Sequence, residues 1–106
     1  MRLSPKKLQV LRDCAREALP GDITYELRLF GSRLDDNRKG GDVDIYLETT
    51  GLSAEQCYEL KLTLRPLLEE ALDLPVDLIV QDAQSPLLLI SHVARDEGVS
   101  ILRHSI

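Results

Sequence analysis

The sequence predicts one α/β domain of the α+β kind: a small mixed β-sheet of three to four strands with helices packed mainly on one face. The chain has 106 residues, a length that fits a single domain with one core. Hydrophobic residues make up 43% and charged residues 29% of it, as in globular rather than disordered proteins. Segments that alternate apolar and polar residues are separated by segments with helical spacing, which is typical of strands joined by helices.

The first half of the chain predicts a helix and two strands. Ser4-Pro5 is a helix start, with Ser as the N-cap and Pro at the first helical position, and Pro20-Gly21 ends that helix. Residues 23–30 alternate in polarity and predict a strand. Residues 35–41 have the composition of a loop, and residues 42–48 alternate again as a second strand.

The second half predicts a long helix and three shorter elements. Ser53 opens the long helix, with Gln56 in place for a capping box. Pro66 lies inside this pattern and should kink the helix or split it near Arg65. The shorter elements are a strand over 76–81, a helix from Ser85-Pro86 to near Gly98, and a last strand over 99–102.

Charge and composition narrow the possible partners and compartment. There are 13 Lys and Arg against 18 Asp and Glu, and the formal charge is −5. A chain without a basic surplus is not expected to bind nucleic acid strongly. No apolar run is long enough for a membrane span and the N-terminus has no signal-peptide core. With two cysteines and no disulfide framework, we expect a reduced cytoplasmic protein. Its oligomeric state, including a homo-oligomer, is left open.

Three features of the sequence carry chemistry. Gly31-Ser32 ends an apolar strand in a turn whose free backbone N–H groups would suit a phosphate. Asp42 and Asp44 share one face of the next strand, about 7 Å apart along the chain. Asp77 interrupts the apolar strand 76–81. If that strand pairs beside residues 42–48, three carboxylates converge.

Converging carboxylates repel one another unless a cation neutralises them. Ligands that are all oxygen suit Mg²⁺ or Mn²⁺, and Mg²⁺ prefers one or two carboxylates together with substrate phosphates. A phosphate-binding turn beside such acids therefore predicts a metal-bridged nucleoside triphosphate and phosphoryl or nucleotidyl transfer.

These residues resemble the minimal nucleotidyltransferase group of the polymerase-beta-like nucleotidyltransferase superfamily. The likeness consists of Gly31-Ser32, then Asp42-Val43-Asp44 after nine residues, and Asp77 on a later strand, and it spans most of residues 1–106. It implies one minimal nucleotidyltransferase domain. It also implies that Gly31 and Ser32 hold the triphosphate. The family's cation near the triphosphate is missing here, and Arg33, Arg38 or Lys39 could compensate, with Arg33 assigned to nucleotide binding. Asp42, Asp44 and Asp77 would be the catalytic and metal-binding residues, and Asp77 would help to activate the attacking hydroxyl.

The resemblance implies an Mg²⁺-dependent enzyme that moves a nucleoside monophosphate from a triphosphate, ATP being the expected donor, to a hydroxyl of a protein or small molecule. Minimal members of the superfamily resemble the antitoxin half of two-component systems, and the implied partner is an all-helical HEPN-type protein. Asp35 and Asp36 stand where the family often has Arg-Gly. This departure motivates a second hypothesis, an adaptor or antitoxin subunit that binds the helical partner without turnover. A third is a subunit that becomes active only with that partner.

Structural roles are the alternatives for the same residues. Asp42 and Asp44 could be exposed on an edge strand, Asp77 could be a capping carboxylate, and Gly31-Ser32 could be an ordinary turn. An Asp-x-Asp also occurs in phosphatases and glycosyltransferases. In those phosphatases an apolar strand leads into the motif, whereas here Gly40-Gly41 precede it.

Neighbouring residues are expected to have structural roles. Tyr46 and Glu48 are predicted on a solvated sheet surface, with substrate contact as the alternative, and Arg28 is predicted to pair with Glu48 or Glu26. Cys14 and Cys57 are expected to be small core residues. His92 and His104 are expected to be surface residues without a special role.

Overall fold

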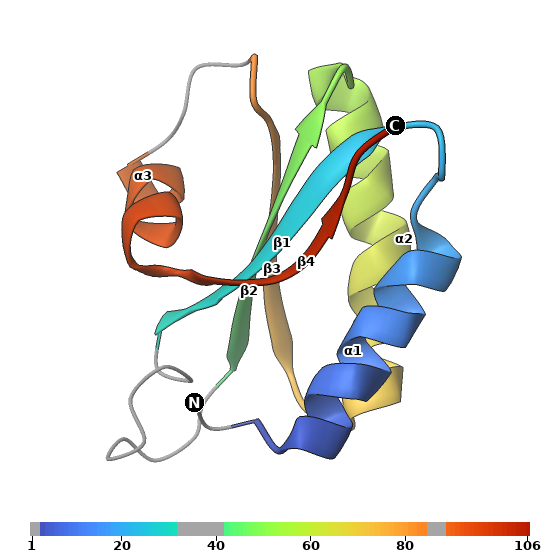
Figure 1. Cartoon of the computed structure of the whole chain (residues 1–106), viewed down its shortest axis with the longest axis vertical. Coiled ribbons are helices and arrows are strands. Elements are labelled where there is room, and N and C mark those ends of the chain that lie inside the picture. The colour runs from blue at the N-terminus through green and yellow to red at the C-terminus, as the bar shows by residue number, and fades with distance from the viewer. Residues whose placement is uncertain (1–2, 32–41, 85–88) are drawn as a thin grey trace.

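The protein is a four-stranded mixed sheet with helices on both faces, as a computed structural model shows for residues 3–31, 42–84 and 89–106, the side chains of residues 89–92 excepted (Figure 1). The strand order is β3-β2-β1-β4. β2 and β3 are parallel, and the other neighbours are antiparallel. In chain order the elements are α1 (Pro5–Ala18), β1 (Thr24–Phe30), β2 (Val43–Thr50), α2 (Ala54–Leu72), β3 (Val76–Asp82), α3 (Leu89–Glu97) and β4 (Val99–His104).

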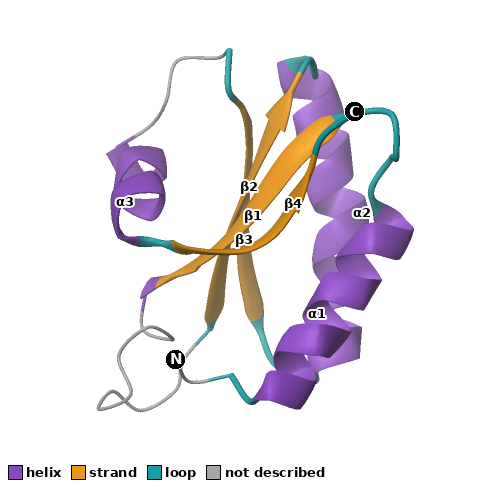
Figure 2. Cartoon of the chain, viewed as in Figure 1, coloured by secondary structure: helices purple, strands orange, loops and turns teal. Residues whose placement is uncertain are grey.

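The two long helices, α1 and α2, cover one face of the sheet, and the short α3 lies on the other (Figure 2). The predicted α+β class and the four-stranded mixed sheet are therefore confirmed. The predicted loop over 35–41 and the helix start at Ser85-Pro86 lie outside the described residues. None of the described helices combines the length and the apolar character that spanning a bilayer requires.

The two predicted helix starts that lie within the described residues are present with their capping hydrogen bonds. Ser4 Oγ accepts from the backbone N–H of Lys7 at 3.1 Å. At the start of α2, Ser53 Oγ accepts from the backbone of Gln56 at 3.1 Å, and the Gln56 side chain accepts from the backbone of Ser53 at 2.9 Å. This reciprocal capping box satisfies two backbone donors that the first turn of a helix would otherwise leave unpaired.

The split predicted at Pro66 does not occur, because α2 continues from Ala54 to Leu72 through that residue. Proline removes one helical hydrogen bond, to the carbonyl four residues earlier at Leu62. Pro66 and Leu62 are both exposed, so water can hydrate the carbonyl that is left over. Leu64 and Leu68 on the opposite side of the helix are fully buried and hold both halves against the sheet. Tertiary packing thus outweighs the local preference to break.

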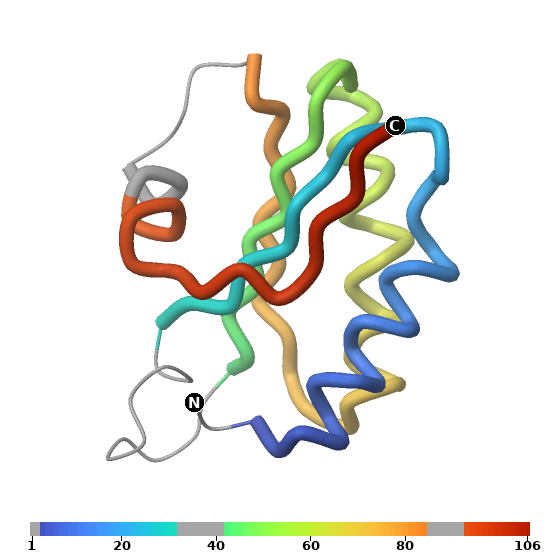
Figure 3. The backbone as a smooth tube through the Cα atoms, viewed as in Figure 1, coloured from blue at the N-terminus to red at the C-terminus, as the bar shows by residue number. Residues whose placement is uncertain are grey.

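The main core lies between the sheet and the pair α1 and α2. Every second residue of each strand points into this core. The apolar residues that alternate with polar ones in the sequence therefore form one continuous layer. These include Leu27 and Leu29 of β1, Val43, Ile45 and Leu47 of β2, and Val76 and Leu78 of β3. The chain path in Figure 3 shows how the last strand, β4, returns beside β1 to complete this layer.

Asp82, which the sequence did not single out, fixes the turn between β2 and α2. Its carboxylate is 2% exposed and accepts hydrogen bonds from Thr49 Oγ1 at 3.0 Å, the Leu52 backbone at 2.8 Å and the Gln84 backbone at 3.1 Å. Burial alone would raise the pKa of Asp82, but these bonds together with one from the Gly51 backbone outweigh it and lower that pKa.

Replacing Pro66 should stabilise the protein. Pro66→Ala restores the helical hydrogen bond to Leu62, and we expect the free energy of unfolding to rise by about 1–3 kcal/mol. Urea denaturation followed by circular dichroism measures it. Pro75→Ala is the control, because Pro75 lies outside the helix and should give no such gain. An unchanged midpoint for Pro66→Ala would mean that the helix already accommodates the proline without cost.

Replacing Asp82 should destabilise the protein in a pH-dependent way. Asp82→Asn is expected to lower the free energy of unfolding at pH 7 by about 1–3 kcal/mol, since the amide nitrogen cannot accept a hydrogen bond. The folded-state pKa is lowered, so the carboxylate's contribution is complete above its ordinary pKa of 3.8 and is lost as the pH falls through the lowered value. Denaturation at several pH values should show the difference between the two proteins narrowing below that pKa. Exposed Asp22→Asn should change stability little at any pH.

Candidate functional site

The face of the sheet opposite α1 and α2 presents its side chains in rows that run across the strands. Register partners of neighbouring strands form each row, because paired residues point to the same face. The acidic row consists of Phe30, Asp44 and Asp77. The middle row consists of Arg28, Tyr46 and Ile79. The glutamate row begins with Glu26 and Glu48.

The acidic row brings together two of the predicted site residues. Asp44 of β2 and Asp77 of β3 are register partners on adjacent parallel strands, which lie about 4.8 Å apart. Asp77 is exposed and Asp44 is half-buried. Within the part of the chain that the structure describes, the Asp77 side chain makes no hydrogen bond or ion pair. Two carboxylates placed this closely repel each other, and a cation bound between them would relieve that repulsion.

Gly31 lies directly against Asp44, at the end of β1. Its φ angle is +75°, in the region that glycine tolerates and other residues rarely adopt. A Cβ at this position would overlap the Oδ2 atom of Asp44 and stand 2.8 Å from its Cγ. The turn that ends β1 and the carboxylate of β2 therefore occupy one corner of the sheet, and only a residue without a side chain leaves room for both.

The other predicted site residues are placed less closely. Asp42 is exposed and comes one residue before β2, whose first residue, Val43, is tied to β3 by a 2.9 Å hydrogen bond to the Pro75 carbonyl. Among the described residues, no three His, Cys, Asp or Glu side chains stand close enough to hold a metal ion together. Ser32 and Arg33 lie outside the described residues.

The donor set at this corner suits a hard cation that takes several ligands from its substrate. Carboxylate oxygens of Asp44 and Asp77 are ligands that Mg²⁺ and Mn²⁺ accept, and Asp42 lies two residues along the chain from Asp44. Mg²⁺ is commonly held by one or two carboxylates with phosphate oxygens and water completing its octahedron. Asp44 and Asp77, aligned beside Gly31, could supply the one or two carboxylates that Mg²⁺ needs, so the protein need not provide all of its ligands.

The prediction of a solvated surface at Tyr46 is wrong. Tyr46 is fully buried, packed with Phe30, Ala94 of α3 and the partly buried Ile79. Its hydroxyl donates to Glu48 Oε1 at 3.1 Å. The burial follows from α3, which covers the middle row, and strand periodicity in the sequence cannot show which part of a face a distant helix will cover.

The glutamate row is neutralised by arginines. Glu26 and Glu48 stand opposite each other on β1 and β2, which alone would be repulsive. Arg28 pairs with Glu26 at 3.1 Å, as predicted, and Arg103 pairs with it at 2.9 Å. Arg95 of α3 pairs with Glu48 at 3.3 Å. These carboxylates already have cationic partners, so they differ from Asp77 of the acidic row.

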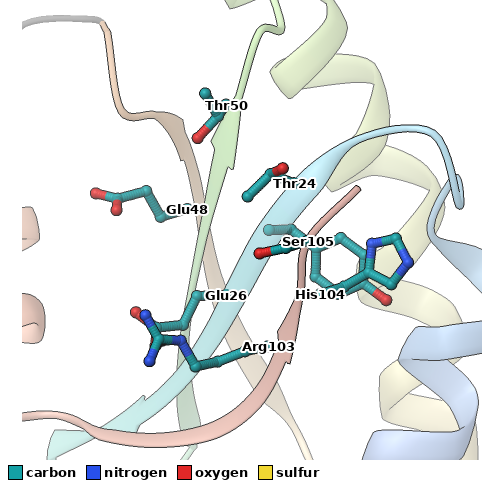
Figure 4. A pocket seen from close by; sticks show the side chains of 8 residues that line it. Thr24, Glu26, Glu48, Thr50, Arg103, His104 and Ser105 are labelled. Carbon is teal, nitrogen blue, oxygen red and sulfur yellow. Dashed lines mark ion pairs between the residues drawn. The ribbon is translucent and has the colours of Figure 1, made fainter.

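A small cavity of about 130 Å³ lies at this end of the sheet face (Figure 4). Its lining is polar, with the hydroxyl side chains of Thr24, Thr50 and Ser105 beside Glu26, Glu48 and Arg103. Because its charges are already paired within the sheet, this cavity indicates a structural polar cluster rather than a second reactive site.

The remaining sequence predictions have mixed outcomes. Cys57 is buried, as predicted for a small core residue, and Cys14 is half-buried. His104 is not a plain surface group. Its ring stacks on Tyr25 with centroids 5.1 Å apart, and its Nδ1 lies 2.9 Å from the Ile23 carbonyl, to which it can only donate. The side chain of His92 is outside the described residues.

The sequence matches no protein-family model and no curated protein.

The overlap between Gly31 and Asp44 predicts a specific pattern of stabilities. Gly31→Ala should lower the free energy of unfolding by about 1–3 kcal/mol, from the positive φ and from the contact with Asp44. Adding Asp44→Ala removes the contact, so the double variant should recover the steric part and retain the smaller backbone part. Chemical denaturation of the four proteins of this cycle measures the coupling. Strictly additive losses would contradict direct packing between the two residues.

Proposed function

We propose that the protein is an Mg²⁺-dependent nucleotidyltransferase that transfers a nucleoside monophosphate from a nucleoside triphosphate, with ATP as the expected donor, to a hydroxyl of a protein or small molecule. The observation that supports it most is the acidic row. Asp44 and Asp77 are aligned on neighbouring strands, and the glycine corner at Gly31 touches Asp44. Acids that would bind a metal and a turn that would admit a polyphosphate meet at one place.

Each residue has a defined task in this reaction. Gly31 makes room for the Asp44 carboxylate at the turn that would meet the triphosphate, since a side chain at this position would overlap that carboxylate. Asp42 and Asp44 would hold Mg²⁺, which when bound neutralises phosphate charge and lowers the pKa of the acceptor hydroxyl. Asp77, exposed at the same corner, orients that hydroxyl and takes up its proton. The hydroxyl oxygen then bonds to the α-phosphorus, the bond to the bridging oxygen breaks, and pyrophosphate leaves.

The charge of the chain supports a protein or small-molecule acceptor over templated nucleic-acid synthesis. A net charge of −5 disfavours binding to phosphate backbones. In keeping with the resemblance, we propose a helical HEPN-type protein as partner and acceptor, with this chain as the antitoxin of the pair and the cytoplasm as its compartment.

A second candidate is an adaptor or antitoxin subunit that binds this partner without turnover. Asp35 and Asp36 favour it, because the family often has a cation followed by glycine at those places. A third is a subunit that is active only in the complex. The candidates differ in whether label is transferred, and in what must be added for transfer.

The test uses ATP labelled on the α-phosphate, Mg²⁺ and an extract of the source cells. Asp44→Asn and Asp77→Asn should each reduce label transfer by roughly 10²-fold or more, because each removes a charge that the transition state requires. Glu59→Gln is the matched control, since Glu59 is an exposed acid on α2, on the far side of the sheet. It should leave transfer unchanged.

Other results select among the candidates. If no acceptor is labelled although a helical partner co-purifies, the adaptor is correct and the enzyme is rejected. If transfer begins only when that partner is added, the third candidate is correct. Equal loss in the Glu59→Gln control would show that the assay responds to surface charge rather than to the acidic row.

A further inference from the structure

Val93 of α3 is an apolar side chain that stays exposed beside the candidate site. It is 36% exposed, whereas the next residue, Ala94, is fully buried. Ala94 packs on Phe30 of the acidic row and on Tyr46 and Ile79 of the middle row. The helix thus sits over the middle row and borders the acidic row.

The flank of α3 that carries Val93 follows from helix geometry. Successive residues are about 100° apart around a helix, so Val93 and Arg95 project on opposite sides of Ala94, which faces the sheet. Arg95 reaches Glu48 in the glutamate row at 3.3 Å. Val93 therefore lies on the other flank, the one that faces the acidic row with Asp44 and Asp77.

The position of α3 is fixed by polar contacts at its C-terminal end. Arg28 of the middle row donates to the Gly98 carbonyl at 3.2 Å, and the Gly98 backbone donates to the Ala94 carbonyl at 2.9 Å. A Cβ at Gly98 would overlap that carbonyl oxygen of Ala94 and stand 3.2 Å from Cβ of Arg28. Close packing at Gly98 and the pair Arg95–Glu48 hold the helix at a set place along the strands.

We propose that Val93 and Ile79 form an apolar ledge against which the base of the nucleotide packs while its phosphates meet Gly31 and the acidic row. Ile79 is partly buried and lies two residues beyond Asp77 on the same face of β3. The ledge and the acids are thus adjacent, which matches a ligand with one flat apolar end and one polyanionic end. This inference rests on the proposed function, because it names the part of that same substrate that α3 recognises.

The test compares ATP with inorganic tripolyphosphate, which has the phosphates but no base, by calorimetry in the presence of Mg²⁺. Wild type should bind ATP more tightly than tripolyphosphate. Val93→Ser should weaken ATP binding about five- to tenfold, as expected for the loss of one apolar contact surface, and should leave tripolyphosphate binding unchanged.

A matched control is available in β4. Val99 is a valine of similar exposure, 43%, whose register partner Leu29 points to the opposite face of the sheet. Val99→Ser should change neither affinity. Val93→Thr keeps the volume and branching of valine, so it should still weaken ATP binding selectively if Val93→Ser proves too unstable to measure.

The outcomes separate this inference from the proposed function. If tripolyphosphate binds and ATP binds no more tightly, or if Val93→Ser weakens both equally, the ledge is rejected and the triphosphate site stands. If neither compound binds to wild type, both the proposed function and the ledge are rejected.

Discussion

The parallel pairing of β2 with β3 is the constraint on which the candidate site depends. This pairing sets Asp44 beside Asp77. A shift of the register by one residue would turn one of these two side chains to the face that α1 and α2 cover. The register is fixed from the buried side, where Val43 and Ile45 of β2 oppose Val76 and Leu78 of β3. Two side chains of α2 bind the backbone of Val76 in β3. The Glu69 carboxylate accepts a hydrogen bond from the Val76 N–H at 2.9 Å, and Arg65 Nε donates one to the Val76 carbonyl at 3.0 Å. Apolar packing on one face thus determines where charges meet on the other.

The two faces of the sheet divide stability and chemistry between them. The face under α1 and α2 carries a continuous apolar layer, which supplies most of the burial. The opposite face holds two charged rows separated by the buried Tyr46, and its glutamates are balanced by arginines from three elements. The balance ends at the acidic row, where Asp77 is exposed beside Asp44. Among the described residues Asp77 makes no ion pair, and a cation bound there would add to the stability of the folded protein.

Local signals in the sequence predict most of the fold but little of the open face. Capping residues, alternation and turn residues give the elements and their order, because each depends on neighbours in the chain. The sequence left a kink or a split open at Pro66, because the choice depends on which side of α2 meets solvent. Tyr46 was misjudged because α3 covers it from a distant part of the chain. Asp82 was missed for a similar reason, since its partners Thr49 and Leu52 lie far from it in the sequence. Asp44 and Asp77 were predicted to meet only on the condition that their strands pair, and the pairing is a tertiary property.

Close packing of Gly31 against Asp44 bears on the choice between an enzyme and an adaptor. A subunit that only bound a partner through its helices would have no physical need for a left-handed glycine in contact with a carboxylate. Nor would it need a second carboxylate in register beside the first. A positive φ costs glycine little, and a ligand that carries both a cation and phosphates would meet the glycine and the carboxylates at one place. This coincidence is the physical reason for proposing the transferase ahead of the adaptor, since one substrate would account for both features.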